Sequence, residues 1–229
     1  MVPTPGSAKG YILALPVKTM GKIAKGINHH NNNINNGSRP KSSAAQLLLF
    51  ARNFVKHPND VGWMLPSTPF VVDSVLKKVE WENAQVIVEY GPGVGTFTGR
   101  ILERMRPDAK LIALEINDEF VKYLGKALND PRLLVVKESA ADVDLVLAKL
   151  ALAPADYVIS GIPFKTLPHD LRDTIVRKTH SVLRPRGSFL VYQLSNAVLP
   201  YLEQVFGAVS REVELANIMP AQFFWCARG

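Results

Sequence analysis

Short apolar runs alternate with amphipathic stretches along most of the chain. The runs are rich in Val, Ile and Leu and predict strands at 86–90, 111–115, 133–136, 157–160 and 189–193, with two more at 210–215 and 223–227. Apolar residues at helical spacing predict helices at 69–79, 96–106, 118–128, 142–150, 168–183 and 197–206. This alternation indicates an α/β fold with a mostly parallel, seven-stranded sheet and helices on both faces. Ligands of such sheets bind at the carboxyl ends of the strands.

A glycine-rich turn follows the first predicted strand. The strand ends in Glu89, and glycines occupy every second position that follows, at Gly91, Gly93 and Gly95. A helical pattern begins at once with Thr96. Glycine allows a backbone to approach a ligand where a Cβ would clash, so a strand, a glycine turn and a helix in this order indicate a cradle for a nucleotide cofactor. The spacing is neither that of dinucleotide sites nor that of P-loops.

The second predicted strand also ends in an acid. Glu115, followed by Ile116, stands about 20 residues beyond the last glycine, where a carboxylate commonly binds ribose hydroxyls. Its two oxygens can accept both hydroxyl protons of a diol. A chance strand followed by a chance acid is the alternative, because a single glycine motif is weakly specific.

The E-x-G-x-G-x-G pattern resembles motif I of class I methyltransferases that depend on S-adenosylmethionine (SAM). The resemblance implies a Rossmann-like fold and SAM as cofactor, with S-adenosylhomocysteine as product. By this resemblance, Glu89 holds the amino-acid moiety of SAM, directly or through a water, and the glycines and Thr96 allow close approach of the cofactor. The ribose is bound by Glu115 and Ile116, and the adenine by Ser139 and Ala140 after the third strand. Asp142 is expected to cap the helix that follows.

The fourth strand ends in a loop that bears on the methyl acceptor. Residues 160–164 read S-G-I-P-F and resemble the N-[LI]-P-[FY] motif of amine methyltransferases, including the ribosomal RNA adenine dimethylases. In that motif the Asn and a backbone carbonyl accept hydrogen bonds from the target amine, but Gly161 stands in the place of the Asn. This departure disfavours a planar base amine, whereas Ser160 and the loop carbonyls can still orient a tetrahedral alkylamine. We assign substrate binding to Gly161, Ile162, Pro163 and Phe164; an ordinary strand-end turn is the alternative.

A broader resemblance covers about residues 44–228. Gly62 and the Pro66-Ser67-Thr68 loop, the glycine motif, S-G-I-P and the strand 189–193 together resemble bacterial phospholipid N-methyltransferases. The resemblance implies methylation of the amine head group of a membrane lipid, phosphatidylethanolamine and its methylated derivatives, with Pro66 and Ser67 over the cofactor. Tyr192 and His169 are candidate proton acceptors, with Ser160 as a third catalytic candidate; alternatively, Tyr192 is a packed aromatic and His169 a surface residue.

Basic charge is concentrated at the N-terminus. Eight Lys and Arg and no acid precede Asp60, whereas the remainder holds 19 basic and 20 acidic residues. We divide the chain into a basic, flexible or amphipathic arm over 1–40 and a methyltransferase domain over 41–229, with 41–57 as an apolar lid or membrane helix. The arm favours a polyanionic surface, and residues 16–27 form a basic amphipathic pattern that suits an anionic membrane. A merely solvated basic tail is the alternative.

Partners and compartment follow from the same features. We expect a monomer. We also expect it to bind the inner face of the cell membrane from the cytoplasm without crossing it, because no apolar run approaches the ~20 residues that span a bilayer. The single cysteine, Cys226, excludes an internal disulfide and fits a reducing compartment. The histidines lack zinc spacing, so we expect no metal.

Other functions stay open. A nucleic-acid methyltransferase of the adenine dimethylase type is favoured by the arm and by the I-P-F match, and disfavoured by Gly161 and by the nearly neutral domain. Another lipid or small-molecule amine, such as an ornithine lipid, is an intermediate case. The last alternative is a non-catalytic membrane-binding or RNA-binding module that retains the cofactor-binding fold.

Overall fold

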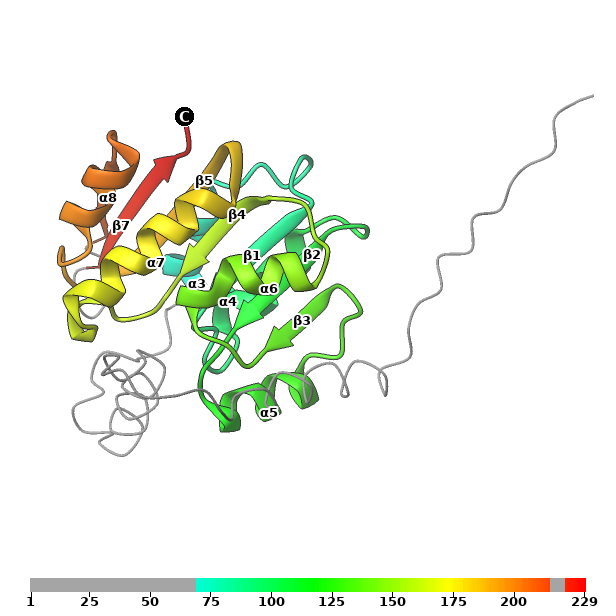
Figure 1. Ribbon diagram of the computed structural model, residues 1–229. Helices are drawn as coiled ribbons and strands as arrows, with labels where there is room; N and C mark the ends of the chain where they lie inside the picture. The colour runs from blue at the N-terminus through cyan, green and yellow to red at the C-terminus, as the bar shows by residue number, and fades with distance from the viewer. Residues whose placement is uncertain (1–68, 215–220) are drawn as a thin grey trace, which may run out of the picture. The chain divides into compact units, whose positions relative to one another are not determined.

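The computed structural model describes residues 69–214 and 221–229 (Figure 1). The predicted arm, the helix at 41–57 and the loop with Pro66 and Ser67 lie outside these residues.

Seven strands form one sheet in the order β3-β2-β1-β4-β5-β7-β6. They are β1 (Val86–Tyr90), β2 (Lys110–Leu114), β3 (Leu133–Val136), β4 (Ala155–Ser160), β5 (Leu183–Gln193), β6 (Ser210–Glu214) and β7 (Ala221–Ala227). The first five pair in parallel, and β7 runs antiparallel between β5 and β6. The predicted fold class is confirmed. The five parallel strands, β1 to β5, bring their carboxyl ends to one edge of the sheet, the lower one in Figure 1.

Helices cover both faces of the sheet. α6 (Val143–Lys149), α7 (His169–Val182) and α8 (Leu199–Phe206) supply the apolar cluster on one face. α3 (Pro69–Leu76) and α4 (Thr96–Arg104) supply the cluster on the other. α5 (Asp118–Ala127) follows β2 and lies beside β3, and the short 3-10 helices η2 (Ala140–Asp142) and η3 (Phe164–Thr166) follow β3 and β4. None of the helices in the described ranges has the length and apolar character needed to cross a bilayer.

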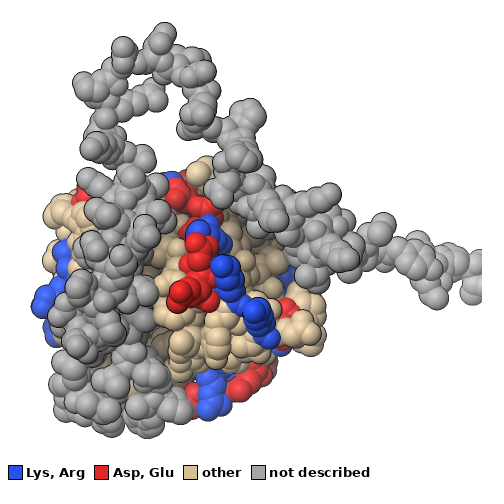
Figure 2. Space-filling model, turned by 90° about the horizontal axis from the view of Figure 1, so that it is seen from below, with Lys and Arg blue, Asp and Glu red and all other residues tan. Residues whose placement is uncertain are grey.

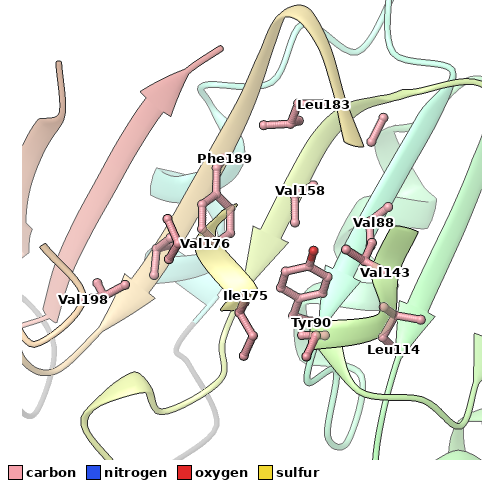
Figure 3. Close-up of a cluster of buried hydrophobic side chains, with 14 of the residues drawn as sticks. Val88, Tyr90, Leu114, Val143, Val158, Ile175, Val176, Leu183, Phe189 and Val198 are labelled. Atoms are coloured by element: carbon pink, nitrogen blue, oxygen red, sulfur yellow. The ribbon is translucent and has the colours of Figure 1, made fainter. Parts of the chain in front are cut away.

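The apolar core beneath α7 contains a hydrogen-bonded polar pair, Tyr90 and Thr179. Figure 3 shows Tyr90, Val158 and Phe189 pointing from β1, β4 and β5 to the same side of the sheet. The Tyr90 hydroxyl lies 3.0 Å from Oγ1 of Thr179. Since Thr179 donates its only hydroxyl proton to the Ile175 carbonyl, Tyr90 must be the donor of this bond. The pair satisfies a buried hydroxyl and holds the end of β1 against α7.

The fifth strand starts earlier than its hydrophobic pattern predicts. We expected it at 189, but β5 begins at Leu183 and contains Pro185 and Gly187, which disguise it. Asp156 accepts hydrogen bonds from the backbone N–H groups of Gln85 and Val86 and from the Arg184 guanidinium. The bond from Arg184, which the local pattern does not reveal, ties the polar start of β5 to β4, and the other two tie the start of β1 to β4.

Candidate functional site

The glycine loop between β1 and α4 has the conformation that only glycine adopts without strain. Gly91, Gly93 and Gly95 have φ of 66°, 55° and 84°. A Cβ at Gly91 would stand 2.6 Å from Cγ2 of Ile162, and one at Gly95 would stand 2.7 Å from Cδ2 of Leu124. In contrast, a Cβ built at Gly93 would meet no atom within 4 Å among the described residues, its two chain neighbours apart. The loop is therefore packed on two sides and open at its centre, as a cradle for a ligand requires.

Glu115 links the cradle to the end of β2. Its side chain is almost fully buried and accepts hydrogen bonds from the N–H of Gly93 at 3.1 Å and of Asn117 at 2.9 Å. Burial raises the pKa of the Glu115 carboxyl, although the backbone donors act against this. A carboxylate has about four acceptor positions, so two stay available for a diol such as ribose.

Glu89 lies beneath the same loop. It is buried at the end of β1 and accepts a hydrogen bond of 2.8 Å from the Thr98 hydroxyl of α4. Burial, opposed by the Thr98 bond and assisted by the neighbouring charge of Glu115, raises the pKa of Glu89 to about 8. Burial and the neighbouring carboxyl of Glu115 thus favour the protonated form of Glu89, which a cationic ligand next to it would oppose. The sequence prediction gave no role to Thr98; its place on the buried face of α4, three residues after Gly95, was the available signal.

The end of β3 differs in one detail from the sequence prediction. We expected Asp142 to cap α6, and it occupies that position but makes no capping hydrogen bond with its side chain. Ser139 caps the preceding 3-10 helix η2, and its hydroxyl accepts a hydrogen bond from the N–H of Ala141 at 3.0 Å. Because the bond consumes only an acceptor position, the Ser139 hydroxyl can still donate to a ligand. Ala140 is buried next to it.

The acceptor loop, residues 160–164, leaves the end of β4 beside the cradle. Ser160 is fully buried, and its Oγ has no hydrogen-bond partner among the residues that the structure describes. The N–H of Gly161 donates to the Tyr90 carbonyl, which ties the loop to β1. Ile162 meets Gly91, and Phe164 is fully buried below it. An unsatisfied buried hydroxyl is uncommon in proteins, so Ser160 is a strong candidate for contact with a ligand.

Gln193 at the end of β5 fixes this loop. Its Nε2 donates to the carbonyl of Ile162 at 2.6 Å and to that of Tyr192 at 2.7 Å, while its Oε1 accepts from the N–H of Phe164 at 3.2 Å. Both polar atoms of the amide are thus hydrogen-bonded within the protein. The sequence prediction included Gln193 only as the last residue of the strand 189–193; a polar amide at the end of an apolar run was the signal that it has partners.

The two candidate proton acceptors occupy different surroundings. The Tyr192 ring lies between those of Phe97 and Phe223, with centroid distances of 6.1 and 5.7 Å, and so lies beside the start of α4. His169 is exposed at the first position of α7 and packs edge-on against Tyr201 of α8, with centroids 5.1 Å apart. Tyr192 therefore lies nearer to the cradle, and His169 lies five residues beyond the acceptor loop.

The edge that carries these residues has mixed charge. Figure 2 views the molecule from the side to which the parallel strands point, and blue and red side chains lie next to each other on its described surface. Lys137, after β3, and Asp118, at the start of α5, form one such pair at 2.6 Å. Within the described residues, no group of three His, Cys, Asp or Glu side chains could hold a metal ion.

Sheet order, glycine cradle and buried carboxylates together define a class I SAM-dependent methyltransferase. The residues fit the cofactor, since the open space at Gly93 and the spare acceptor positions of Glu115 lie on the same edge. Glu89, Gly91, Gly93, Gly95 and Glu115 would hold it. When bound, SAM supplies an electrophilic methyl group on a positively charged sulfur.

Comparison with known proteins places the chain more narrowly. Residues 66–194 match the sequence profile of the family described as ribosomal RNA adenine dimethylase, and the chain belongs to this family. The ornithine lipid N-methyltransferase of Singulisphaera acidiphila is 30% identical over 181 residues, which cover 78% of this chain and 94% of that protein. The dimethyladenosine transferase of Chaetomium thermophilum is 28% identical over 175 residues, which cover 76% of this chain but only 41% of that protein.

Solved structures agree on the fold. An O-methyltransferase from Bacillus cereus, solved in complex with S-adenosylhomocysteine, superposes with a TM-score of 0.62 at 13% identity, over 83% of this chain and 92% of that one. The N1-methyltransferase of 1,6-didemethyltoxoflavin from Burkholderia thailandensis superposes with a TM-score of 0.59 at 12% identity, over 84% of this chain and 92% of that one. At such low identity these superpositions show the fold alone. The methyl acceptor has to be inferred from this chain's own residues.

Proposed function

We propose that this protein transfers methyl groups from SAM to the primary amine of a membrane lipid. The observation that carries the proposal is the acceptor loop. It presents a buried Ser160 hydroxyl, with no partner among the described residues, next to a glycine where the dimethylase motif has Asn. The similarity to an ornithine lipid N-methyltransferase over nearly all of that protein's length supports a lipid amine.

The loop suits an alkylamine better than a base. Ser160 Oγ can accept one N–H, and the Ile162 carbonyl, already bound by Gln193, retains a second lone pair. Two such acceptors can orient a tetrahedral nitrogen without the flat slot that an adenine ring needs. The nitrogen must lose a proton before it can attack, because an ammonium has no lone pair. Burial between the loop and the cradle lowers the pKa of an amine and so favours that loss.

The head group and the place of action belong to the same proposal. Phosphatidylethanolamine and ornithine lipids both carry a primary alkylamine, so either fits this loop. We propose that the basic arm before Asp60 holds the enzyme on an anionic membrane surface from the cytoplasmic side, since each Lys or Arg near such a surface contributes on the order of 1 kcal/mol.

Methylation of ribosomal RNA is the second candidate. The family match and the I-P-F sequence of residues 162–164 favour it. The missing Asn and the balanced charge from Asp60 onward are the observations against it.

Labelled SAM would decide between the candidates. The full chain is incubated in parallel with anionic vesicles that contain phosphatidylethanolamine, with the same vesicles that contain ornithine lipid, and with ribosomal RNA. We expect label in at least one of the lipid fractions. Label in RNA alone would overturn the proposal in favour of the dimethylase activity.

A further inference from the structure

Arg172 of α7 is fixed beside the residues that continue the acceptor loop. Its Nε donates to the Leu167 carbonyl and its Nη2 to the Lys165 carbonyl, both at 2.9 Å. The turns between these residues are tight, because the N–H of Phe164 donates to the Ile162 carbonyl and the N–H of Leu167 donates to the Phe164 carbonyl. The guanidinium is therefore held within a few residues of the loop that we assign to the methyl acceptor.

The charge of Arg172 has no acidic partner in the part of the chain that the structure describes. In contrast, Arg177 of the same helix forms an ion pair with Asp173 at 2.8 Å. A guanidinium has five N–H groups, and the two loop carbonyls use two of them, so three are left without a described partner. The guanidinium lies over the Tyr201 ring of α8, with 6.0 Å from Cζ to the ring centroid. Arg172 is thus a half-buried, oriented cation with donors to spare.

Ser160 and Arg172 are found on the same side of the sheet. Ser160 is aligned with Tyr90 of the neighbouring strand β1, so the two side chains leave the sheet on one face. Tyr90 reaches Thr179 of α7, the helix that carries Arg172. A lipid whose amine binds at Ser160 would therefore have the N-terminal part of α7 beside its head group.

We propose that Arg172 binds the anionic group that the lipid carries close to its amine. The inference rests on the proposed lipid amine activity. Phosphatidylethanolamine has a phosphodiester, and an ornithine lipid has a carboxylate, within a few bonds of the amine, so both head groups present a cation and an oxyanion together. Arginine binds either oxyanion through charge-assisted hydrogen bonds, often two in parallel. Such a contact would orient the amine and select zwitterionic lipids over amines that lack an anion.

Acceptors with and without the anion test this inference. The full chain and its Arg172→Gln variant are assayed with SAM in mixed micelles of a nonionic detergent. The micelles contain phosphatidylethanolamine, ornithine lipid or a long-chain alkylamine, which has no anion and is followed as substrate or as competitive inhibitor. We expect kcat/KM for the lipid to fall roughly 10–100-fold, as for one lost hydrogen bond between charged groups. The KM or inhibition constant of the alkylamine should change far less.

The comparison separates an anion contact from a mere brace of the loop. If Arg172 only holds the carbonyls of Lys165 and Leu167, the variant loses as much on the alkylamine as on the lipids, and the inference is overturned. A selective loss on phosphatidylethanolamine assigns the phosphodiester to Arg172, and a selective loss on ornithine lipid assigns the carboxylate. If the wild-type chain methylates lipids only on phosphatidylglycerol vesicles, the same comparison is made there.

Arg177→Gln is the matched control, because it removes the same charge from the same helix. It should leave the preference for lipid over alkylamine unchanged, and Arg172→Lys, which keeps the charge, should recover part of it. SAM calorimetry and thermal melts show whether each variant keeps the fold. An equal change of preference in Arg172→Gln and Arg177→Gln, or no change in either, would overturn the role of Arg172. A wild-type chain that methylates RNA and neither lipid would instead overturn the proposed function.

Discussion

The side-chain amide of Gln193 joins the carbonyl of Ile162 across 31 positions of sequence, with 2.6 Å between Nε2 and the oxygen. The same amide accepts a hydrogen bond from the N–H of Phe164. One residue of β5 therefore satisfies both backbone groups that flank Pro163. The loop that follows β4 is thus shaped by the strand next to it. This bridge makes Gln193 a positioning residue for the methyl acceptor, although it does not contact the cofactor cradle directly.

Gln193→Ala should lower kcat while leaving SAM binding nearly unchanged. The substitution leaves the Ile162 carbonyl and the Phe164 N–H without their partner, which typically costs about 1–3 kcal/mol of stability. A loop displaced by a fraction of an ångström should reduce kcat by roughly 10–100-fold. Initial rates and SAM calorimetry check this. Gln193→Glu, which keeps an acceptor for Phe164 and loses the donor to Ile162, should fall between; a wild-type kcat in both variants would contradict the role.

Glu115→Ala should weaken SAM binding. The side chain anchors Gly93 and would bind the ribose, and a hydrogen bond to a charged group contributes about 1.5–3 kcal/mol, so we expect the dissociation constant to rise by roughly 10–100-fold. Calorimetric titration with SAM measures it. Glu119→Ala, an exposed acid on α5, is the control. Unchanged affinity in Glu115→Ala would exclude Glu115 from the cofactor site.

Glu89 should make the free protein less stable as the pH rises. Burial raises its folded-state pKa to about 8 from a model value of 4.5, so between these values the folded protein keeps a proton that the unfolded chain has released. The free energy of unfolding therefore falls with increasing pH in this window, by up to about 1.4 kcal/mol per unit. Urea denaturation from pH 5 to 8 should show a smaller slope in Glu89→Gln, which can still accept from Thr98. Glu115 and Glu138, whose pKa values are raised in the same direction, contribute to the slope that remains. Identical slopes in wild type and variant would refute the assignment.

Ser160→Ala should separate a structural from a functional role. The Oγ atom has no partner in the described structure, so its removal breaks no hydrogen bond and should leave the melting temperature unchanged or slightly higher. If Ser160 receives the amine, kcat/KM for the lipid should fall about tenfold, as expected for one lost hydrogen bond of roughly 1.4 kcal/mol. Thermal melts and initial rates test this, and a variant with wild-type kcat/KM would remove Ser160 from the mechanism.

Deletion of residues 1–40 should weaken binding to anionic vesicles and spare SAM affinity. The deletion removes five of the eight basic residues that precede Asp60, and the loss should be largest at low salt because salt screens such contacts. Sedimentation with phosphatidylglycerol vesicles at two salt concentrations measures the effect. Vesicle binding that the deletion leaves intact at physiological salt would contradict membrane docking by the arm.

Much of the fold could be predicted from local pattern. The extents of β1 and β3 agree with their apolar runs, and the helices agree to within a few residues, because burial of a strand or of one helical face selects apolar residues at a fixed period. The start of β5 was missed, since Pro185, Arg186 and Gly187 interrupt the pattern while the long-range bond from Arg184 to Asp156 holds the segment in place.

The candidate site likewise has features that the sequence predicts and features that only the tertiary structure reveals. Sequence alone predicted the cradle and its acids, because they stand at or just after the ends of two strands, where a local pattern marks them. They are Glu89, Gly91, Gly93, Gly95 and Glu115. Only the tertiary structure decided that Ile162 closes against Gly91 and that Gln193 fixes the acceptor loop. These relationships join segments that are distant in sequence. They depend on which strands lie side by side and in what register, and a period of two or 3.6 residues carries no information about that.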